Sequence, residues 1–222
     1  GVMTMVLGII ETFKPEYIAA CYDLPEPTYR HTAYASYKGT RKETDDALVR
    51  QIVRSYDIFK ALGIPVFEVA GFEADDMLGT LAHQTKAIPE LRVVIASGDM
   101  DTLQCVDGDR VSVFTLKKGI KDTIIYNEAA VIERFGFAPV HIPDYKGLRG
   151  DTSDNIPGIK GIGEKTASEL IATFGSLEDI YKVVRTQPEK LAAAGVKTRM
   201  IELLTNGEEE ALFSKMLATI RT

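Results

Sequence analysis

Histidine and cysteine are scarce in this chain, which has 3 histidines and 2 cysteines among its 222 residues. His31, His83 and His141 are scattered, and Cys21 and Cys105 lie in apolar contexts without the spacing of metal ligands. This distribution excludes a clustered zinc site and a Ser–His or Cys–His catalytic arrangement. We expect both thiols to be buried and reduced, as in cytoplasmic proteins.

Long apolar runs are also missing. No stretch approaches the roughly 18 apolar residues that a membrane span needs, and the first residues do not follow the pattern of a signal peptide. The apolar share of 45% is enough for a packed core, and the length suits one α/β domain with a small appendage. The sequence has no repeats and no long linker. The chain is expected to be a cytoplasmic monomer that does not contact membranes.

The formal net charge of −6 argues at first against nucleic-acid binding. However, many of the acidic residues fall into four compact clusters, and the rest of the chain carries a small positive charge. The clusters are Asp23; Glu73, Asp75 and Asp76; Asp99 and Asp101; and Asp151 and Asp154. If they converge on bound metal, the surface that remains for DNA is mildly basic.

Apolar runs that predict strands alternate with helical patterns, which indicates an α/β fold with a mainly parallel central sheet. Strands are expected at 17–22, 65–69 and 91–96, with a hairpin from 111–115 and 123–126 joined by residues 117–120. Helices are expected at 2–13 and 48–62, from the acidic residues at 73–76 through Leu81, and between Asn127 and Gly136. Three acidic clusters follow predicted strands, at the edge where parallel sheets bind ligands.

Each acidic cluster also has an ordinary interpretation. A single aspartate after a strand usually forms a turn, and one or two acids at the start of a helix stabilise its dipole. Three carboxylates as close as Glu73, Asp75 and Asp76 repel each other unless a cation lies nearby. Ligands that are all oxygen favour Mg²⁺ or Mn²⁺, and two such ions about 4 Å apart can clamp a phosphodiester.

The segment 24–44 has few residues suited to a core. It mixes Arg30, Lys38, Arg41 and Lys42 with several tyrosines. Basic residues among aromatic ones suit contact with a flexible single strand, through phosphate pairing and base stacking. A solvated, mobile loop is the alternative. The segment directly follows Asp23, and this position favours substrate contact.

The run 146–170 combines an acidic pair with a glycine-rich turn. Asp151 and Asp154 are three residues apart, so a helical turn would place both carboxylates on one side. Glycines at 158, 161 and 163 suit a tight turn, and the helix expected at 164–173 would begin with free backbone N–H groups that can bind phosphate. A helix–turn–helix corner with solvated aspartates is the alternative. From residue 142 onward the chain is expected to be all-helical, with Ser176 capping a later helix.

Three motifs resemble the 5′-nuclease (flap endonuclease) family, the 5′-nuclease domain of bacterial DNA polymerase I. They are GFEADD, SGDMDTLQ and GLRGDTSDNIPGIKGIGEKTA, and the resemblance covers nearly the whole chain. It implies a PIN-like or resolvase-like nuclease core over 1–141, with an arch at 24–46, and a helix–hairpin–helix subdomain over 142–222 that holds duplex DNA. It also implies structure-specific 5′-3′ exonuclease and flap endonuclease activity with Mg²⁺, on 5′ flaps and RNA primers in replication and repair, with K⁺ at the hairpin.

The resemblance also implies residue roles. Around the first metal it places Asp23, Glu73, Asp75 and Asp76, and at the second Asp99, Asp101, Asp151 and Asp154. Lys38, Arg41 and Lys146 match basic catalytic positions near the scissile phosphate. The DNA contacts that it implies are Arg30, Gly158, Lys160, Gly161, Ile162, Gly163, Lys165 and Thr166.

The chain departs from the family pattern in three respects. The family's first strand, with an aspartate that binds the first metal, is not found in this sequence, and Met100 stands where the family usually has lysine. The sequence also ends before any polymerase region, so it predicts no polymerase activity. Besides the preferred nuclease, two alternatives therefore stay open: a DNA-structure binder that does not cleave, and a nuclease of the same core directed at RNA.

Overall fold

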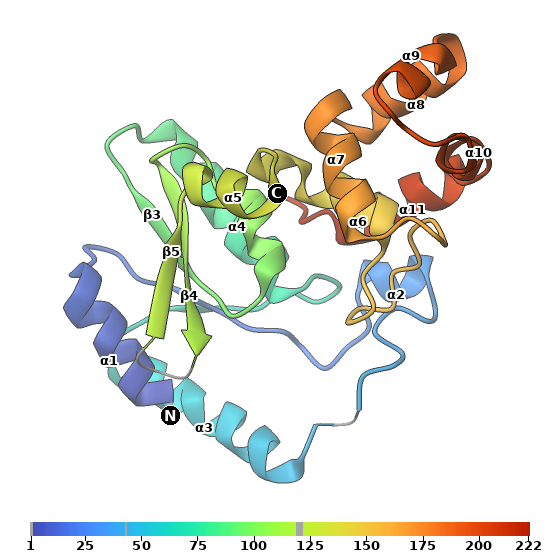
Figure 1. Ribbon diagram of the computed structural model, residues 1–222. Helices are drawn as coiled ribbons and strands as arrows, with labels where there is room; N and C mark the ends of the chain where they lie inside the picture. The colour runs from blue at the N-terminus through green and yellow to red at the C-terminus, as the bar shows by residue number, and fades with distance from the viewer. Residues whose placement is uncertain (1, 43, 119–121) are drawn as a thin grey trace.

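The computed structural model describes residues 2–42, 44–118 and 122–222 (Figure 1). Its strands are β1 (Ala20–Cys21), β2 (Val66–Phe67), β3 (Val93–Ala96), β4 (Val111–Lys118) and β5 (Asp122–Tyr126). The helices of its first part are α1 (Val2–Phe13), α2 (Tyr29–Ala33), α3 (Asp46–Ala61), α4 (Ala74–Gln84) and α5 (Glu128–Phe135), with short 3₁₀ turns η1 (Thr85–Ala87) and η2 (Met100–Cys105). Strands and helices alternate as the sequence predicts, so the α/β class is confirmed.

The strands form two small sheets. β1 and β2 are parallel, with Ala20 opposite Val66. β3 pairs in parallel with β4, and β4 pairs antiparallel with β5, so the second sheet is mixed. The predicted hairpin is confirmed, although residues 119–121 of its turn lie outside the described residues. The first two strands are shorter than predicted, and Tyr17, expected in a buried strand, is 78% exposed.

Helix ends follow local chemistry. The Asn127 side chain accepts a hydrogen bond from Ala130 N at the start of α5, and Gly136 ends that helix in the left-handed conformation with φ 84°. Ser176 caps the later helix α8 (Leu177–Thr186) by accepting from Asp179 N. The capping predictions at 127, 136 and 176 are therefore confirmed.

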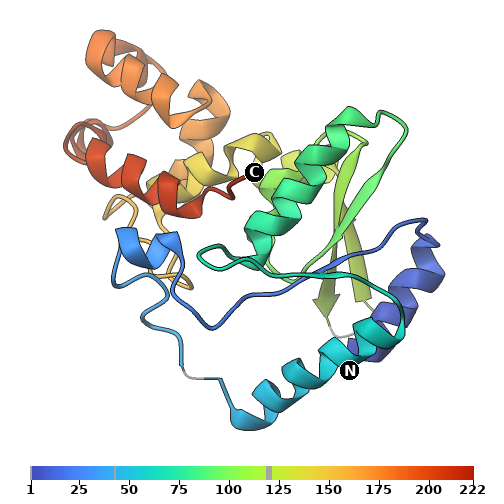
Figure 2. The same ribbon diagram turned by 180° about the vertical axis from the view of Figure 1, so that it is seen from behind.

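The second part is helical. It contains η3 (Pro139–His141), α6 (Ile142–Arg149), α7 (Glu164–Phe174), α8, α9 (Pro188–Ala193), α10 (Thr198–Asn206) and α11 (Glu208–Ala218). Figures 1 and 2 show these helices to one side of the α/β part, with the C-terminus beside α4. One buried apolar cluster runs from Ile95 and Leu103 through Tyr145 and Leu148 to Leu177, so the two parts share a core. No helix among the described residues is long and apolar enough to cross a membrane.

One local prediction is wrong. Asp151 and Asp154 do not lie on a helical turn but in a loop after α6, closed by paired backbone hydrogen bonds between Asp151 and Ile156 of 2.9 and 2.8 Å. In the segment 24–44, the alternative of a loop solvated throughout does not hold, because Arg30 and Tyr37 are each only 3% exposed. When an arginine or a tyrosine stands among polar residues, the local sequence does not indicate whether the apolar part of its side chain will be buried.

Candidate active site

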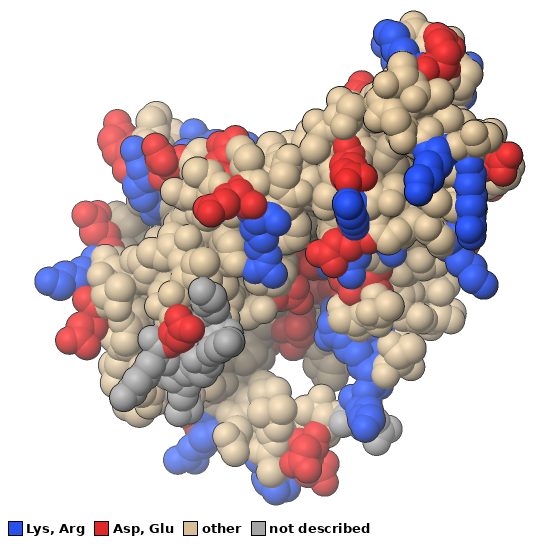
Figure 3. Space-filling view, viewed as in Figure 1, with Lys and Arg blue, Asp and Glu red and all other residues tan. Residues whose placement is uncertain are grey.

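The four acidic clusters come together in the recess between the α/β part and the helical part. Each is delivered by the end of an element: Asp23 after β1, Glu73, Asp75 and Asp76 at the start of α4, Asp99 and Asp101 after β3, and Asp151 and Asp154 after α6. Figure 3 shows Asp and Glu side chains gathered in the hollow at the centre of this face, with Lys and Arg side chains beside it. The clusters therefore lie near one another, and their convergence on a metal ion stays a prediction.

Mutual repulsion is strongest at Asp75. Burial raises the pKa of this carboxyl to about 7, and the charges of Asp99, Asp101, Asp23 and Glu73 add to the rise. No hydrogen bond or ion pair reaches the Asp75 side chain from the described residues. Asp75 is therefore a carboxyl surrounded by others without a compensating cation, the condition under which a carboxylate binds a metal or keeps its proton.

Lys146 joins two of the clusters. Its ammonium donates to Asp101 and, at 2.5 Å, to Asp151 Oδ2. Burial raises the pKa of Asp151, but Lys146 and hydrogen bonds from Ser153 outweigh burial and lower it to about 2. At Asp101 burial prevails over Lys146, and the pKa rises to about 6.

Glu73 and Asp154 are joined through Tyr37. The buried hydroxyl of Tyr37 lies 3.2 Å from Glu73 Oε2 and 3.1 Å from Asp154 Oδ2. Lys38 Nζ lies 2.8 Å from Glu73 Oε1 and 4.0 Å from Asp154 Oδ2, and Arg41 Nη2 lies 2.5 Å from Asp154 Oδ1. Lys38 and Arg41 therefore neutralise Glu73 and Asp154.

Backbone contacts hold the Tyr37–Arg41 segment against the Asp154 loop. Lys38 N donates to Asp154 O at 2.9 Å, and Asn155 Nδ2 donates to Ser36 O at 2.7 Å. Lys38 and Asn155 both have positive φ, of 54° and 56°. Non-glycine residues rarely adopt this conformation, and such strain gathers at functional sites.

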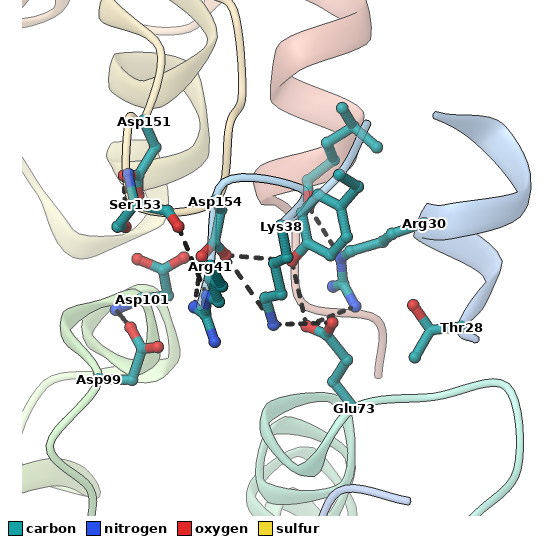
Figure 4. A network of polar contacts seen from close by, with 12 residues as sticks. Thr28, Arg30, Lys38, Arg41, Glu73, Asp99, Asp101, Asp151, Ser153 and Asp154 are labelled. Atoms are coloured by element: carbon teal, nitrogen blue, oxygen red, sulfur yellow. Dashed lines mark hydrogen bonds and ion pairs between the residues drawn. The ribbon is translucent and has the colours of Figure 1, made fainter. Parts of the chain in front are cut away.

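Three predicted site residues have specific structural partners. Asp23 is exposed, and its Oδ1 accepts from Ala74 N at 2.7 Å, which caps the start of α4. Asp99 accepts from Asp101 N at 2.9 Å. Arg30 is enclosed and donates to Asp76, so the structure does not place it on the surface where DNA contact was expected. Figure 4 shows Arg30 on the side of the site away from Asp99 and Asp101.

The glycine-rich turn divides into a buried and an exposed half. Gly158 and Ile162 are buried and Thr166 is half-buried, whereas Lys160, Gly161, Gly163 and Lys165 are exposed. Gly163 is the N-cap of α7 and makes no side-chain cap, so the first N–H groups of this helix are open to an anion. Of the DNA contacts expected here, the exposed four have the access that the role requires.

The donors present fit an oxygen-preferring divalent cation. The converging side chains are carboxylates, and ammonium and guanidinium groups lie between several of them, which shows that the recess attracts cations. Among residues 2–42, 44–118 and 122–222, however, no three His, Cys, Asp or Glu side chains are arranged to surround one ion. Lys146, Lys38 and Arg41 would have to yield part of their contacts to a metal.

Sequence reasoning missed two residues of the site. The aromatic pattern of 24–44 predicts base stacking for its tyrosines, but the buried hydroxyl of Tyr37 lies within hydrogen-bond distance of two carboxylates. Ser153 donates to Asp151 Oδ1 through its hydroxyl and its backbone N–H, at 2.6 and 2.9 Å. The only signal in the sequence was adjacency, because Tyr37 precedes Lys38 and Ser153 lies between the two aspartates.

Comparison with known proteins supports one family over the whole chain. Residues 1–136 match the family described as the 5′-3′ exonuclease, N-terminal resolvase-like domain, and residues 137–222 match its C-terminal SAM fold. The chain belongs to the 5′-3′ exonuclease family. The resemblance stated from its motifs is therefore confirmed.

Curated relatives and solved structures agree with this assignment. DNA polymerase I of Caldicellulosiruptor bescii is 39% identical over 99% of this chain, and that of Bacillus caldotenax is 38% identical over all of it. The chain spans about a quarter of the length of these relatives, 25% and 24%. The bacteriophage T5 protein co-crystallised with metal ions has a TM-score of 0.78 at 23% identity, over 97% of this chain and 80% of that one, which confirms the fold.

Proposed function

We propose that this chain hydrolyses phosphodiester bonds of DNA as a structure-specific 5′-3′ exonuclease and flap endonuclease. The observation that carries the proposal is the meeting of four carboxylate clusters in one recess, together with an exposed helix start in the helical part that suits a phosphate. Family membership supports the same reaction. We further propose that residues 1–141 form the nuclease core and residues 142–222 the DNA-holding subdomain of a monomer that acts in the cytoplasm.

Two Mg²⁺ ions are the proposed cofactors, with Mn²⁺ as a substitute. Asp23, Glu73 and Asp75 would hold one, and Asp99, Asp101, Asp151 and Asp154 the other. Such ions activate water and stabilise the leaving oxygen when bound. The T5 flap endonuclease has been solved in a complex with DNA and metal ions, and the T5 5′-exonuclease has been solved with bound zinc. These structures support the use of divalent metal ions here. K⁺ at the glycine-rich turn stays a prediction.

The chain's basic residues would bind and orient the substrate. Lys38, Arg41 and Lys146 lie within ion-pair distance of site carboxylates, so they can neutralise a phosphate that enters beside them. Lys160, Lys165 and the start of α7 would grip the duplex backbone at a distance from the chemistry. Their exposure on one turn supports a contact that positions DNA without reading its sequence.

A DNA-structure binder that does not cleave is the second candidate. It is favoured by the ion pairs of Lys146, Lys38 and Arg41, which already neutralise carboxylates that a metal would otherwise need to balance. This candidate predicts binding to flaps that weakens with salt. It predicts no cleavage at any Mg²⁺ concentration.

The deciding experiment is cleavage of a 5′-labelled flap duplex with Mg²⁺, beside an Asp151→Ala variant. Cleavage that is lost in the variant supports the nuclease and its carboxylate site. Flap binding without cleavage supports the second candidate. A parallel RNA flap separates a DNA nuclease from one directed at RNA, or shows that both are cut.

A further inference from the structure

The carboxylate of Asp76 is saturated by hydrogen bonds. Its Oδ1 accepts from Arg30 Nη2 at 2.8 Å and from Arg221 N at 2.9 Å. Its Oδ2 accepts from Arg30 Nη1 at 2.8 Å and from Glu73 N at 3.0 Å. Each oxygen thus has two donors, and a carboxylate has about four lone-pair sites in all.

Burial closes the remaining access to this group. Asp76 is 2% exposed, whereas its neighbour Asp75 is half-buried and faces the other acidic clusters. Successive residues on a helix point in different directions, so the start of α4 turns one aspartate into the recess and the other away from it. A metal ion could reach Asp76 only by displacing Arg30 or a backbone N–H.

Arg30 is saturated in the same way. Besides its two bonds to Asp76, its Nε donates to Leu217 O and its Nη2 to Thr219 O, both at 2.8 Å. Its Nη1 also lies 3.4 Å from Glu73 Oε2. A planar guanidinium can serve these acceptors together, which the compact ammonium of a lysine cannot do.

These contacts connect three separate segments. Arg30 belongs to α2, Asp76 and Glu73 to the start of α4, and Leu217 and Thr219 to the end of the helical part. The capping of α4 strengthens the connection, because Glu73 is its N-cap and Asp76 accepts from the Glu73 backbone. The orientation of Glu73 in the recess therefore depends on where the last residues of the chain lie.

We propose that Arg30 and Asp76 form a positioning pair, which fixes Glu73 and the start of α4 against residues 217–221, and that Asp76 is not a metal ligand. The proposal corrects the roles that family resemblance implies for both residues. Its statement about metal rests on the proposed function, whereas its statement about position rests on the contacts alone. A buried ion pair of this kind leaves an uncompensated charge when either partner is removed.

The first test compares the neighbouring aspartates by direct Mn²⁺ binding, with Asp75→Asn and Asp76→Asn in the full chain. We expect the loss of Mn²⁺ affinity in Asp75→Asn to exceed that in Asp76→Asn at least about tenfold, because Asp76→Asn disturbs only the orientation of Glu73. Equal losses in the two variants, with circular dichroism showing both folded, would overturn the proposal. If the unsubstituted protein binds no Mn²⁺, the proposed metal centre fails, and the second test decides the positioning role.

The second test is a double-mutant cycle of Arg30→Met and Asp76→Asn in thermal unfolding. We expect strong non-additivity, with the double variant no less stable than the worse single variant; additive losses would contradict the pair. Arg30→Lys provides a milder variant that keeps the charge. Below its melting range we expect kcat for flap cleavage to fall about tenfold while KM changes less than twofold. If kcat falls by no more than the fraction of the variant that is unfolded, the substitution affects only the stability of the protein.

Discussion

The ammonium of Lys146 lies between Asp101 and Asp151, and it is the cation that allows these two carboxylates to share the recess. The two aspartates come from different parts of the fold, one after β3 and one after α6. Lys146 therefore has two proposed tasks: it stabilises the folded protein, and it lies where a phosphate would enter. Its removal should separate these tasks through their pH dependence.

We expect Lys146→Met to destabilise the protein at pH 7 by about 2 kcal/mol. The folded pKa of Asp151, about 2, is below the ordinary value of 3.8, so its stabilising contribution is present above pH 4 and disappears as the pH falls towards 2. The difference between variant and parent should shrink over that range. Urea unfolding at pH 7 and pH 3 measures it, with Lys165→Met, at an exposed lysine, as the control. A difference that does not depend on pH would contradict this account.

Asp75 should show the opposite pH dependence. Its folded pKa of about 7 is raised above 3.8, so the metal-free protein loses stability as the pH rises from 4 to 7. We expect Asp75→Asn to be more stable than the parent at pH 8 in EDTA, on the order of 2 kcal/mol, and equal to it near pH 4. Unfolding curves at both pH values test this expectation. Asp109→Asn, at an exposed aspartate away from the recess, should change neither.

Tyr37→Phe removes one hydroxyl and leaves the ring. Because that hydroxyl donates to Glu73 and Asp154 in a buried site, we expect a loss of about 1–2 kcal/mol in unfolding free energy. We also expect slower single-turnover flap cleavage, since both carboxylates lose an orienting donor. Tyr34→Phe is the matched control, because Tyr34 packs edge-on against Phe213 through its ring. Equal effects of the two substitutions would show that the hydroxyl of Tyr37 has no special role.

Two glycines of the same turn should respond differently to alanine. At Gly158, φ is 60° and a Cβ would lie 2.1 Å from Gly150 N, so we expect Gly158→Ala to cost about 3 kcal/mol or more of stability. At Gly163 a Cβ would meet nothing within 4 Å, so Gly163→Ala should melt near the parent temperature. If a DNA phosphate approaches the start of α7, Gly163→Ala should nevertheless weaken flap binding. Thermal melts and fluorescence anisotropy separate the two effects.

Helix caps and the acidic clusters could be predicted because each depends on neighbours in sequence. Ser176 and Asn127 form their caps within three residues, and Asp75 and Asp101 follow elements whose apolar pattern is clear. The partners of Arg30 and Asp154 could not be predicted in this way. They lie far away in the chain, and nothing local indicates that an arginine will be enclosed or that a tyrosine will bridge two carboxylates.

The Asp151–Asp154 error has a related cause. A spacing of three residues fits a helix, but Gly150, with φ 74°, ends α6 before Asp151, and the chain closes a loop instead. The carboxylates then point to different partners, Asp151 to Lys146 and Asp154 to Tyr37 and Arg41. The metal-ligand roles of both aspartates stay predictions.

The contact between Arg30 and the end of α11 also has a consequence for the order of folding. Arg30 and Leu217 are 187 positions apart, so the guanidinium has no carbonyl from Leu217 until synthesis has reached that residue. Contacts of such separation form late, because the entropy of closing the loop opposes them. Until α11 has emerged from the ribosome, Glu73 and the start of α4 lack this anchor, and the recess is completed only when α11 docks.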